Sequence, residues 1–293
     1  MRKLKQLSVL LLASLVWVSC EKGKEGCLDP AAENYDPLAS RYGPCEYATD
    51  TGTVDPNLID VKIHIEPLVK GSPFVLETVF QDSLNRNFKS SSFRFYVANV
   101  RLIDSDRNKR QVTKTELIDH NTFPPVPAGS PTWDKTIEGR VTKGTYKELY
   151  MGFGVDAELN EEYRPLDYPT DHPLNTTYNG MGWSWKDKYR FAVIEGDIDS
   201  IGNGGTDRAY YIHTGYSDLY KFNSFDLGTP ITFEVGKTYH LYFTQDILRV
   251  YSGLDMATED GRSHTQNAEK KEISIKIQEN LAQSLTFSRY TVE

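Results

Sequence analysis

The chain has 293 residues, a formal net charge of −8 at neutral pH, and 12% aromatic residues. Residues 1–19 carry three positive charges and no negative ones, so their removal leaves a net charge of −11. This acidity argues against nucleic acid or an anionic lipid surface as the main partner. The 18 tyrosines and 13 phenylalanines favour strands over helical bundles.

Residues 1–19 are predicted to be a lipoprotein signal peptide. A positively charged start is followed by an apolar run over 7–18, which is too short to span a bilayer. The small Ser19 precedes Cys20, so we expect Cys20 to be lipid-modified and to become the mature N-terminus. An ordinary signal peptide cut nearby is the alternative. Lipidation would tether the protein in the cell envelope, at the periplasmic face or the cell surface, with the outer membrane favoured.

Residues 20–56 are expected to form a tether that contains a small stapled loop. Once Cys20 carries lipid, Cys27 and Cys45 remain as an even pair in an oxidising compartment, which predicts one disulfide. The sequence between them is rich in Asp-Pro and Gly-Pro turns. Its acidic side chains would suit calcium, but we favour a plain spacer.

Residues 57–293 are predicted to form one β-rich domain. The segment 58–65 alternates, with four β-branched residues on one face and polar residues on the other. Short strands separated by polar turns predict an antiparallel β-sandwich or a barrel-like domain. A Pro- and Gly-rich loop over 121–135 interrupts the series. The further expected strands are 74–80, 92–103, 111–118, 146–155, 189–198, 208–214, 220–226, 231–235 and 238–247.

The C-terminal part carries a helical pattern. Ile273, Ile277, Leu281 and Leu285 recur every four residues, as on an amphipathic helix that packs on a sheet. The final segment, 286–292, is expected to be extended.

No catalytic motif can be named in the chain. It contains no His-Glu-x-x-His, no phosphate-binding glycine loop and no Gly-x-Ser-x-Gly elbow. Its carboxylates single out no general acid–base pair. We therefore expect a protein that is not an enzyme and has no catalytic residues.

Histidines far apart in the sequence remain candidates for a metal site. His64 lies on the polar face of the first strand, His213 ends a Tyr-Tyr-Ile-His segment, and His264 lies just before the C-terminal helix. Imidazole ligands suit copper better than magnesium or calcium. The other interpretation is that each histidine is an ordinary hydrogen-bonded residue. His120 and His240 are not expected to bind metal, and His172 is expected to order its loop.

The segment 180–185, Gly-Met-Gly-Trp-Ser-Trp, is the most distinctive in the chain. If it is extended, Trp183 and Trp185 lie on one face, because side chains two apart on a strand point the same way. The pair then forms either a buried aromatic corner, with Met181 packed against it, or the lining of an oxidisable site.

Several segments together resemble the copper-binding MbnP-like family, periplasmic or lipid-anchored proteins related to the partner protein of methanobactin operons. The resemblance covers roughly residues 57–287, and the Trp-x-Trp segment is its most specific part. The matching segments are His64, 95–103, 117–119, 153–156 with Asn160, 172–175, 180–185, 189–191, 195–196, 213–215, and the His264 stretch before a helix that bears Asn280.

The resemblance implies a β-rich domain that binds copper outside the cytoplasm. It implies histidine ligands, for which His64, His213 and His264 are the candidates. In some members a tryptophan is oxidised to kynurenine by a dihaem, MauG-like partner enzyme, and the kynurenine helps to bind copper. Carried over to this chain, Trp183 and Trp185 are the oxidisable candidates.

A second function class stays open. A surface adhesion or ligand-binding lipoprotein on the same scaffold would use exposed aromatic side chains and would bind no metal. Its candidate residues are Trp133, Tyr210, Tyr211 and Tyr216.

Overall fold

A computed structural model describes residues 57–120, 135–168, 172–183, 188–265 and 271–293, together with two short strands near the N-terminus. The chain divides into two compact units, Met1–Thr49 and Asp50–Glu293. In the first unit, β1 (Glu25–Gly26) pairs in parallel with β2 (Arg41–Tyr42). The predicted signal peptide, the lipid site Cys20 and the disulfide Cys27–Cys45 lie outside the described residues.

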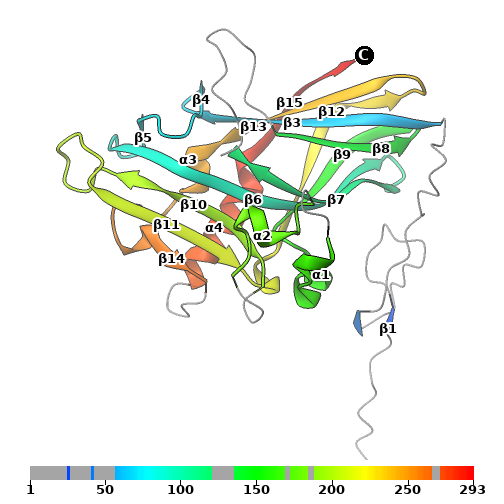
Figure 1. Ribbon diagram of the computed structural model, residues 1–293. Helices are drawn as coiled ribbons and strands as arrows, with labels where there is room; N and C mark the ends of the chain where they lie inside the picture. The colour runs from blue at the N-terminus through cyan, green and yellow to red at the C-terminus, as the bar shows by residue number, and fades with distance from the viewer. Residues whose placement is uncertain are drawn as a thin grey trace, which may run out of the picture. The chain divides into compact units, whose positions relative to one another are not determined.

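The second unit is a β-sandwich, one of the two architectures that the sequence predicts (Figure 1). The larger sheet has the order β12-β9-β6-β10-β11-β14, with β5 and β7 also paired to β6. These strands are β5 (Phe80–Gln81), β6 (Asn87–Asp104), β7 (Lys109–Asp119), β9 (Gly144–Phe153), β10 (Arg190–Ile198), β11 (Arg208–Gly215), β12 (Lys221–Phe233) and β14 (Arg262–His264).

The smaller sheet has the order β15-β13-β3-β4. On the same side as β4, β8 pairs with residues 58–65 of β3. Its strands are β3 (Leu58–Val69), β4 (Ser72–Pro73), β8 (Lys135–Thr142), β13 (Thr238–Asp246) and β15 (Leu285–Val292). Two pairings in the domain are parallel, β3 with β13 and β11 with β14, so both sheets are mixed rather than purely antiparallel.

Buried and exposed side chains alternate along β3 as the sequence predicts, and the β-branched face points into the core. Ile59, Val61, Ile63 and Ile65 are at most 1% exposed, whereas His64 lies on the outer, polar face of the smaller sheet. The core also takes inward residues from β6 of the larger sheet, such as Phe93 and Phe95. Burial of these side chains holds the two sheets together, at roughly 1.5–3 kcal/mol for each large apolar residue.

The predicted C-terminal helix is α4 (Lys271–Ser284). It buries Ile277 and Leu281 in the core and packs against α3 (Ile247–Val250), β11 and β12. The Asn280 side chain donates hydrogen bonds to the carbonyls of Val250 and Ser252, which fixes the helix to the loop after α3.

Two local predictions are wrong. The expected strand 74–80 is mostly a loop: Phe74 is buried by aromatic packing against Phe80 and Phe93, and Glu77 has φ of 60°. Its apolar residues contact the core from a loop: Phe74 is buried, and Leu76 and Phe80 are partly buried against the same core. The strand β8 was not predicted, because it follows a Pro- and Gly-rich stretch and contains Gly139. That glycine lies against β7, where a Cβ atom would come within 2.0 Å of the Val112 carbonyl oxygen.

The remaining elements are short helices in the connections. None of the helices in the described ranges is long and apolar enough to cross a membrane. These short helices are α1 (Ala157–Glu162), η2 (Pro165–Asp167), α2 (Thr176–Asn179), η3 (Ser217–Leu219) and η4 (Glu259–Gly261).

Candidate metal centre

The outer face of β10, β11 and β14 brings two of the predicted histidines together. In the strand register Val193 lies opposite His213, and His213 lies beside His264 across the parallel β11–β14 pair. The two imidazole rings meet edge to face, with centroids 4.5 Å apart and planes at 82°. The ring of Tyr211, two residues before His213, lies 5.2 Å from the His264 ring.

A carboxylate on the neighbouring strand fixes the orientation of His213. The Nε2 atom of His213 lies 2.6 Å from Oε1 of Glu195. A carboxylate can only accept, so the hydrogen bond requires the proton on Nε2. The Nδ1 atom of a neutral His213 then carries the lone pair, and that atom is buried without a hydrogen-bond partner among the residues that the structure describes. His213 is therefore held with one nitrogen available as a ligand.

The surroundings favour neutral imidazoles. Burial lowers the pKa of His213; the hydrogen bond that His213 donates to Glu195 opposes this shift, while His264 and Arg190 add to it. Burial and the Arg190 charge likewise lower the pKa of His264, against a smaller opposing effect of Glu195. Both rings are thus in the form that can bind a metal at neutral pH.

Trp183 lies at the end of this face. A Cβ atom on Gly215 would come within 2.4 Å of Cζ3 of Trp183, so the indole packs directly on the glycine backbone. The Arg190 guanidinium lies 5.9 Å from the centre of the indole. The indole Nε1 of Trp183 is buried and has no acceptor among the described residues. Gly215 follows His213 by two residues, so the indole and the histidine pair share one face of β11.

Thr265 ties the histidine pair to the helix behind it. Its hydroxyl accepts a hydrogen bond from the Gly215 backbone N–H at 3.1 Å, and lies 3.2 Å from the His213 carbonyl and 3.0 Å from the Ser274 hydroxyl on α4. This residue is 2% exposed. These hydrogen bonds hold Thr265, the residue next to His264, against the end of β11.

The third predicted ligand, His64, lies in the other sheet. Its Nε2 atom is 2.9 Å from Nδ1 of His240 on β13, and its ring stacks on Tyr242. The structure therefore forms two histidine pairs, one on each sheet, instead of one cluster of three. Within the described residues, no group of three or more His, Cys, Asp or Glu side chains is arranged to hold a metal ion.

Two further residues of the segment 180–185 were candidates for the site, Met181 and Trp185. Met181 is fully buried in a second core cluster with Tyr96, Tyr189 and Phe191. Trp185 lies outside the described residues.

The remaining two histidines, His172 and His120, pack and form hydrogen bonds within the fold. His172 stacks on Tyr168 at 4.3 Å and its Nδ1 accepts a hydrogen bond from the Leu174 backbone. His120 is buried in the core, where its Nε2 lies 3.2 Å from Oε1 of Gln245.

The aromatic residues expected to form a ligand platform do not share one surface. Tyr210 is 2% exposed and its hydroxyl lies 2.7 Å from that of Ser90, whereas Tyr211 is 36% exposed. Tyr216 contacts Trp183, with ring centroids 6.1 Å apart. Trp133 is outside the described residues.

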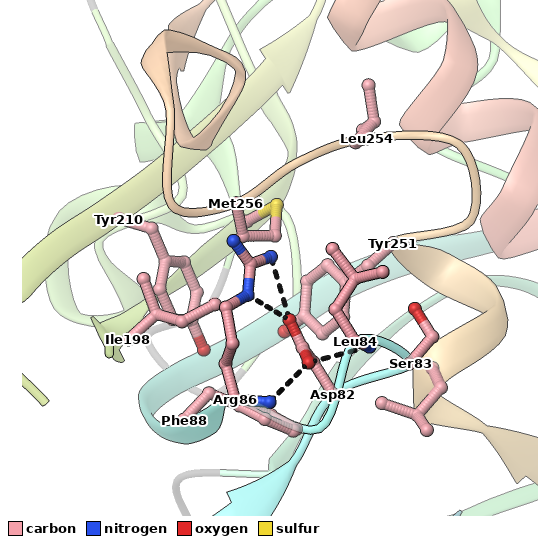
Figure 2. Close-up of a pocket in the computed structure, with 11 residues that line it drawn as sticks. Asp82, Ser83, Leu84, Arg86, Phe88, Ile198, Tyr210, Tyr251, Leu254 and Met256 are labelled. Atoms are coloured by element: carbon pink, nitrogen blue, oxygen red, sulfur yellow. Dashed lines mark hydrogen bonds and ion pairs between the residues drawn. The ribbon is translucent and has the colours of Figure 1, made fainter. Parts of the chain in front are cut away.

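A pocket lies between the turn before β6 and the segment after α3 (Figure 2). Its charged group, Arg86, donates to Asp82 at 2.8 Å and forms an ion pair with Asp255 at 2.8 Å. Leu84, Leu254 and Met256 belong to its apolar lining. Because Arg86 is already paired with Asp82 and Asp255, we interpret the pocket as a packing contact that attaches this turn to the segment after α3.

Glu195 and Arg190 are functional candidates that the sequence analysis did not select as site residues. Both lie in segments that carry the family resemblance, but carboxylates and arginines are too common for either to stand out. The fold identifies them: β10 pairs Glu195 with Tyr211, two residues from His213, and pairs Arg190 with Gly215.

The fold and the site define a class: a β-sandwich protein with a carboxylate-oriented histidine pair on the outer face of one sheet. The family model described as MbnP matches residues 59–270, more than half of the chain, so the chain belongs to the MbnP family. A solved structure, MbnP from Methylosinus trichosporium, is similar at 16% identity and a TM-score of 0.44, covering 68% of this chain and 78% of that one. No curated protein matches the chain at a significant level.

Proposed function

We propose that this chain is an extracytoplasmic, lipid-anchored protein that binds copper through His213 and His264 and is not itself an enzyme. The observation that carries the proposal is the state of His213. Its Nε2 is bound to Glu195, and its Nδ1 is buried without a partner in the described ranges. Metal-binding histidines commonly show this arrangement, in which a carboxylate holds the second ring nitrogen and raises the basicity of the first.

The donor set fits copper. His213 and His264 supply two neutral imidazoles next to each other, and imidazole is a good ligand for copper and for zinc. Bound copper would supply a redox-active cation at the surface of the sheet. Glu195 would orient His213, and Tyr211 would shield the His264 ring from one side.

Trp183 is the better-supported candidate for oxidation. Its indole lies on the same face as the histidine pair, and its buried Nε1 has no acceptor within the part of the chain that the structure describes. The family resemblance supports a dihaem, MauG-like oxidase as the partner that would modify it. Peptide mass spectrometry of protein from its own host tests this: an oxidised residue at Trp183 supports the proposal, and an unmodified Trp183 beside a modified residue elsewhere contradicts it.

Copper titration of the mature protein tests the binding site. We expect one high-affinity copper equivalent, and a loss of at least tenfold in affinity in His213→Ala and in His264→Ala. His172→Gln is the matched control, because it removes an imidazole from a loop away from the site. Unchanged affinity in both site variants would contradict the assignment.

The membrane anchor rests on the Ser19-Cys20 signal alone. Metabolic labelling with a fatty acid, compared between the natural chain and Cys20→Ser, tests it: label that persists in the variant would contradict lipidation at Cys20.

The adhesion alternative has weaker support. It needs several aromatic side chains on one accessible surface, and Tyr210, one of its candidates, is buried.

A further inference from the structure

The outer face of the smaller sheet carries a second imidazole pair, made by His64 on β3 and His240 on β13. These strands are parallel neighbours, although the two histidines are 176 residues apart in sequence. The rings are nearly parallel, at 9°, with Nε2 of His64 only 2.9 Å from Nδ1 of His240.

Oxygen atoms lie at the outer ends of this pair. Nδ1 of His64 is 3.3 Å from the Thr136 hydroxyl, and Nε2 of His240 is 3.4 Å from Oε2 of Glu293. Nε2 of His240 makes no hydrogen bond among the described residues, but the negative charge of the nearby Glu293 favours a proton there, which leaves the Nδ1 lone pair directed at His64. The order of groups is therefore hydroxyl, imidazole, imidazole, carboxylate.

In the neutral pair without metal, Nε2–H of His64 donates a hydrogen bond to Nδ1 of His240, and Nδ1 of His64 accepts a hydrogen bond from the Thr136 hydroxyl. If the His64 proton moves to Nδ1, the Thr136 hydroxyl can accept it, because a hydroxyl is both donor and acceptor. The two inner nitrogens then both present lone pairs to the same space. No proton is lost from the pair in this exchange.

We infer that His64 and His240 form a second binding site for a divalent transition-metal cation, separate from His213 and His264. Two nitrogens bound to a tetrahedral zinc lie about 3.3 Å apart, given bonds of about 2.0–2.1 Å. The present 2.9 Å spacing has to open by a few tenths of an ångström, and the two nearly parallel rings have to turn so that both lone pairs point at the metal. Both side chains project from paired strands, so the backbone keeps the two rings close together.

The charges around the pair favour a cation. The outer face carries the carboxylates of Glu66, Glu138 and Glu293 and the cations Lys62 and Arg289. Lys62 pairs with Glu138 and Arg289 pairs with Glu66, which leaves the Glu293 carboxylate beside His240 to compensate a bound metal. Tyr242 stacks on His64 at 4.5 Å and limits its movement on one side.

Zinc titration of the full mature chain carrying His213→Ala and His264→Ala tests this inference without interference from the first site. We expect one Zn²⁺ per chain, at least tenfold weaker affinity when His240→Gln is added, and a smaller loss when Thr136→Val is added instead. Tyr242→Phe, which keeps the stacked ring, is the matched control and should leave the affinity unchanged. No zinc binding in this background, or equal binding after His240→Gln, would overturn the inference.

Nitrogen-15 NMR of the histidine rings gives a second readout that does not depend on the folding of a variant. Added Zn²⁺ should move the His64 ring proton from Nε2 to Nδ1, and an unchanged tautomer at saturating zinc would also overturn the inference. His240→Gln alone should leave copper binding at His213 intact, so failure here is distinguishable from failure of the proposed copper function.

Discussion

At the scale of single residues, Glu195 decides what His213 can do. The 2.6 Å contact between Nε2 of His213 and Oε1 of Glu195 keeps the ring proton on Nε2. The buried Nδ1 is then the only nitrogen of that ring able to bind a metal. Burial meanwhile lowers the pKa of the ring and keeps it unprotonated. The residue is thus prepared for a ligand before one arrives.

Replacing Glu195 should therefore weaken metal binding in a graded way. Glu195→Gln keeps an oxygen that can accept from Nε2 but loses the charge, and we expect a loss of copper affinity of roughly tenfold. Glu195→Ala removes the acceptor, and we expect a loss nearer a hundredfold. Competition titration against a copper chelator measures both.

Glu259→Gln is the control for this series, because Glu259 pairs with Arg208 at 2.7 Å away from the imidazole rings. Equal affinities in all three variants would mean that Glu195 does not orient a metal ligand.

At the scale of elements, the site depends on β14, a strand of three residues that pairs in parallel with β11. So short a strand needs a further anchor, and Thr265 provides it by joining β11 to α4. The position of His264 is consequently set by the helix as well as by the sheet.

Thr265→Val keeps the shape of the side chain and removes this anchor. The Gly215 N–H loses its buried acceptor, so we expect the free energy of unfolding to fall by roughly 1–3 kcal/mol. Copper affinity should also fall, because His264 is less firmly held. Thr265→Ser, which restores the hydroxyl, should recover most of both effects; recovery of neither would show that the hydroxyl bonds are unimportant.

Gly215 should not tolerate a side chain. In Gly215→Ala the new methyl group meets Cζ3 of Trp183 at 2.4 Å and the Tyr189 carbonyl at 2.7 Å. We expect a loss of roughly 1–3 kcal/mol in the free energy of unfolding and a changed Trp183 fluorescence. Gly205→Ala is the matched control, since its closest neighbour is the flexible Asn203 side chain at 3.0 Å. Equal stability of the two variants would contradict the packing of Trp183 on Gly215.

Periodicity predicted the elements well where one face of a strand is buried. The strands β3, β6, β7, β9, β10, β11 and β13 and the helix α4 each correspond to an expected segment. It missed β8, where Gly139 stands between the inward Ile137 and Val141, and it wrongly predicted a strand over the Phe74 segment. The expected strands 220–226 and 231–235 are one continuous strand, β12, with a register shift between Asp226 and Ile231.

The candidate site was harder to predict, because register and parallel pairing carry no local signal. Nothing near His64 indicates that His240 lies beside it, since the contact depends on the parallel pairing of β3 with β13. The same holds for Glu195 and His213, whose contact follows from the pairing of β10 with β11. The sequence could name His213 and His264 as candidates, but only the fold shows that they are neighbours.

At the scale of the whole molecule, buried histidine should make the fold sensitive to acid. Burial lowers the pKa of His120 to about 4, because the charged ring would lie among Phe74, Phe93 and Phe95. Its unfolded-state pKa is about 6.5. The unfolded chain thus binds more protons between these values, and the contribution of His120 to stability is complete above pH 6.5 and lost as the pH falls towards 4.

This difference in pKa corresponds to about 3 kcal/mol at most. Denaturant unfolding between pH 4 and pH 7 should show a smaller acid loss in His120→Gln than in the natural chain, since glutamine stays neutral throughout. An identical pH dependence in the two proteins would mean that His120 is not the buried titrating group.

The central claim is that copper binds between His213 and His264, and a crystal structure of the protein loaded with one copper equivalent tests it most directly. The anomalous difference map at the copper absorption edge should show a single strong peak within bonding distance of both rings, with Nδ1 of His213 as the ligand atom and Glu195 still bound to Nε2. A peak only at His64 and His240, or none in the sandwich domain, would contradict the claim.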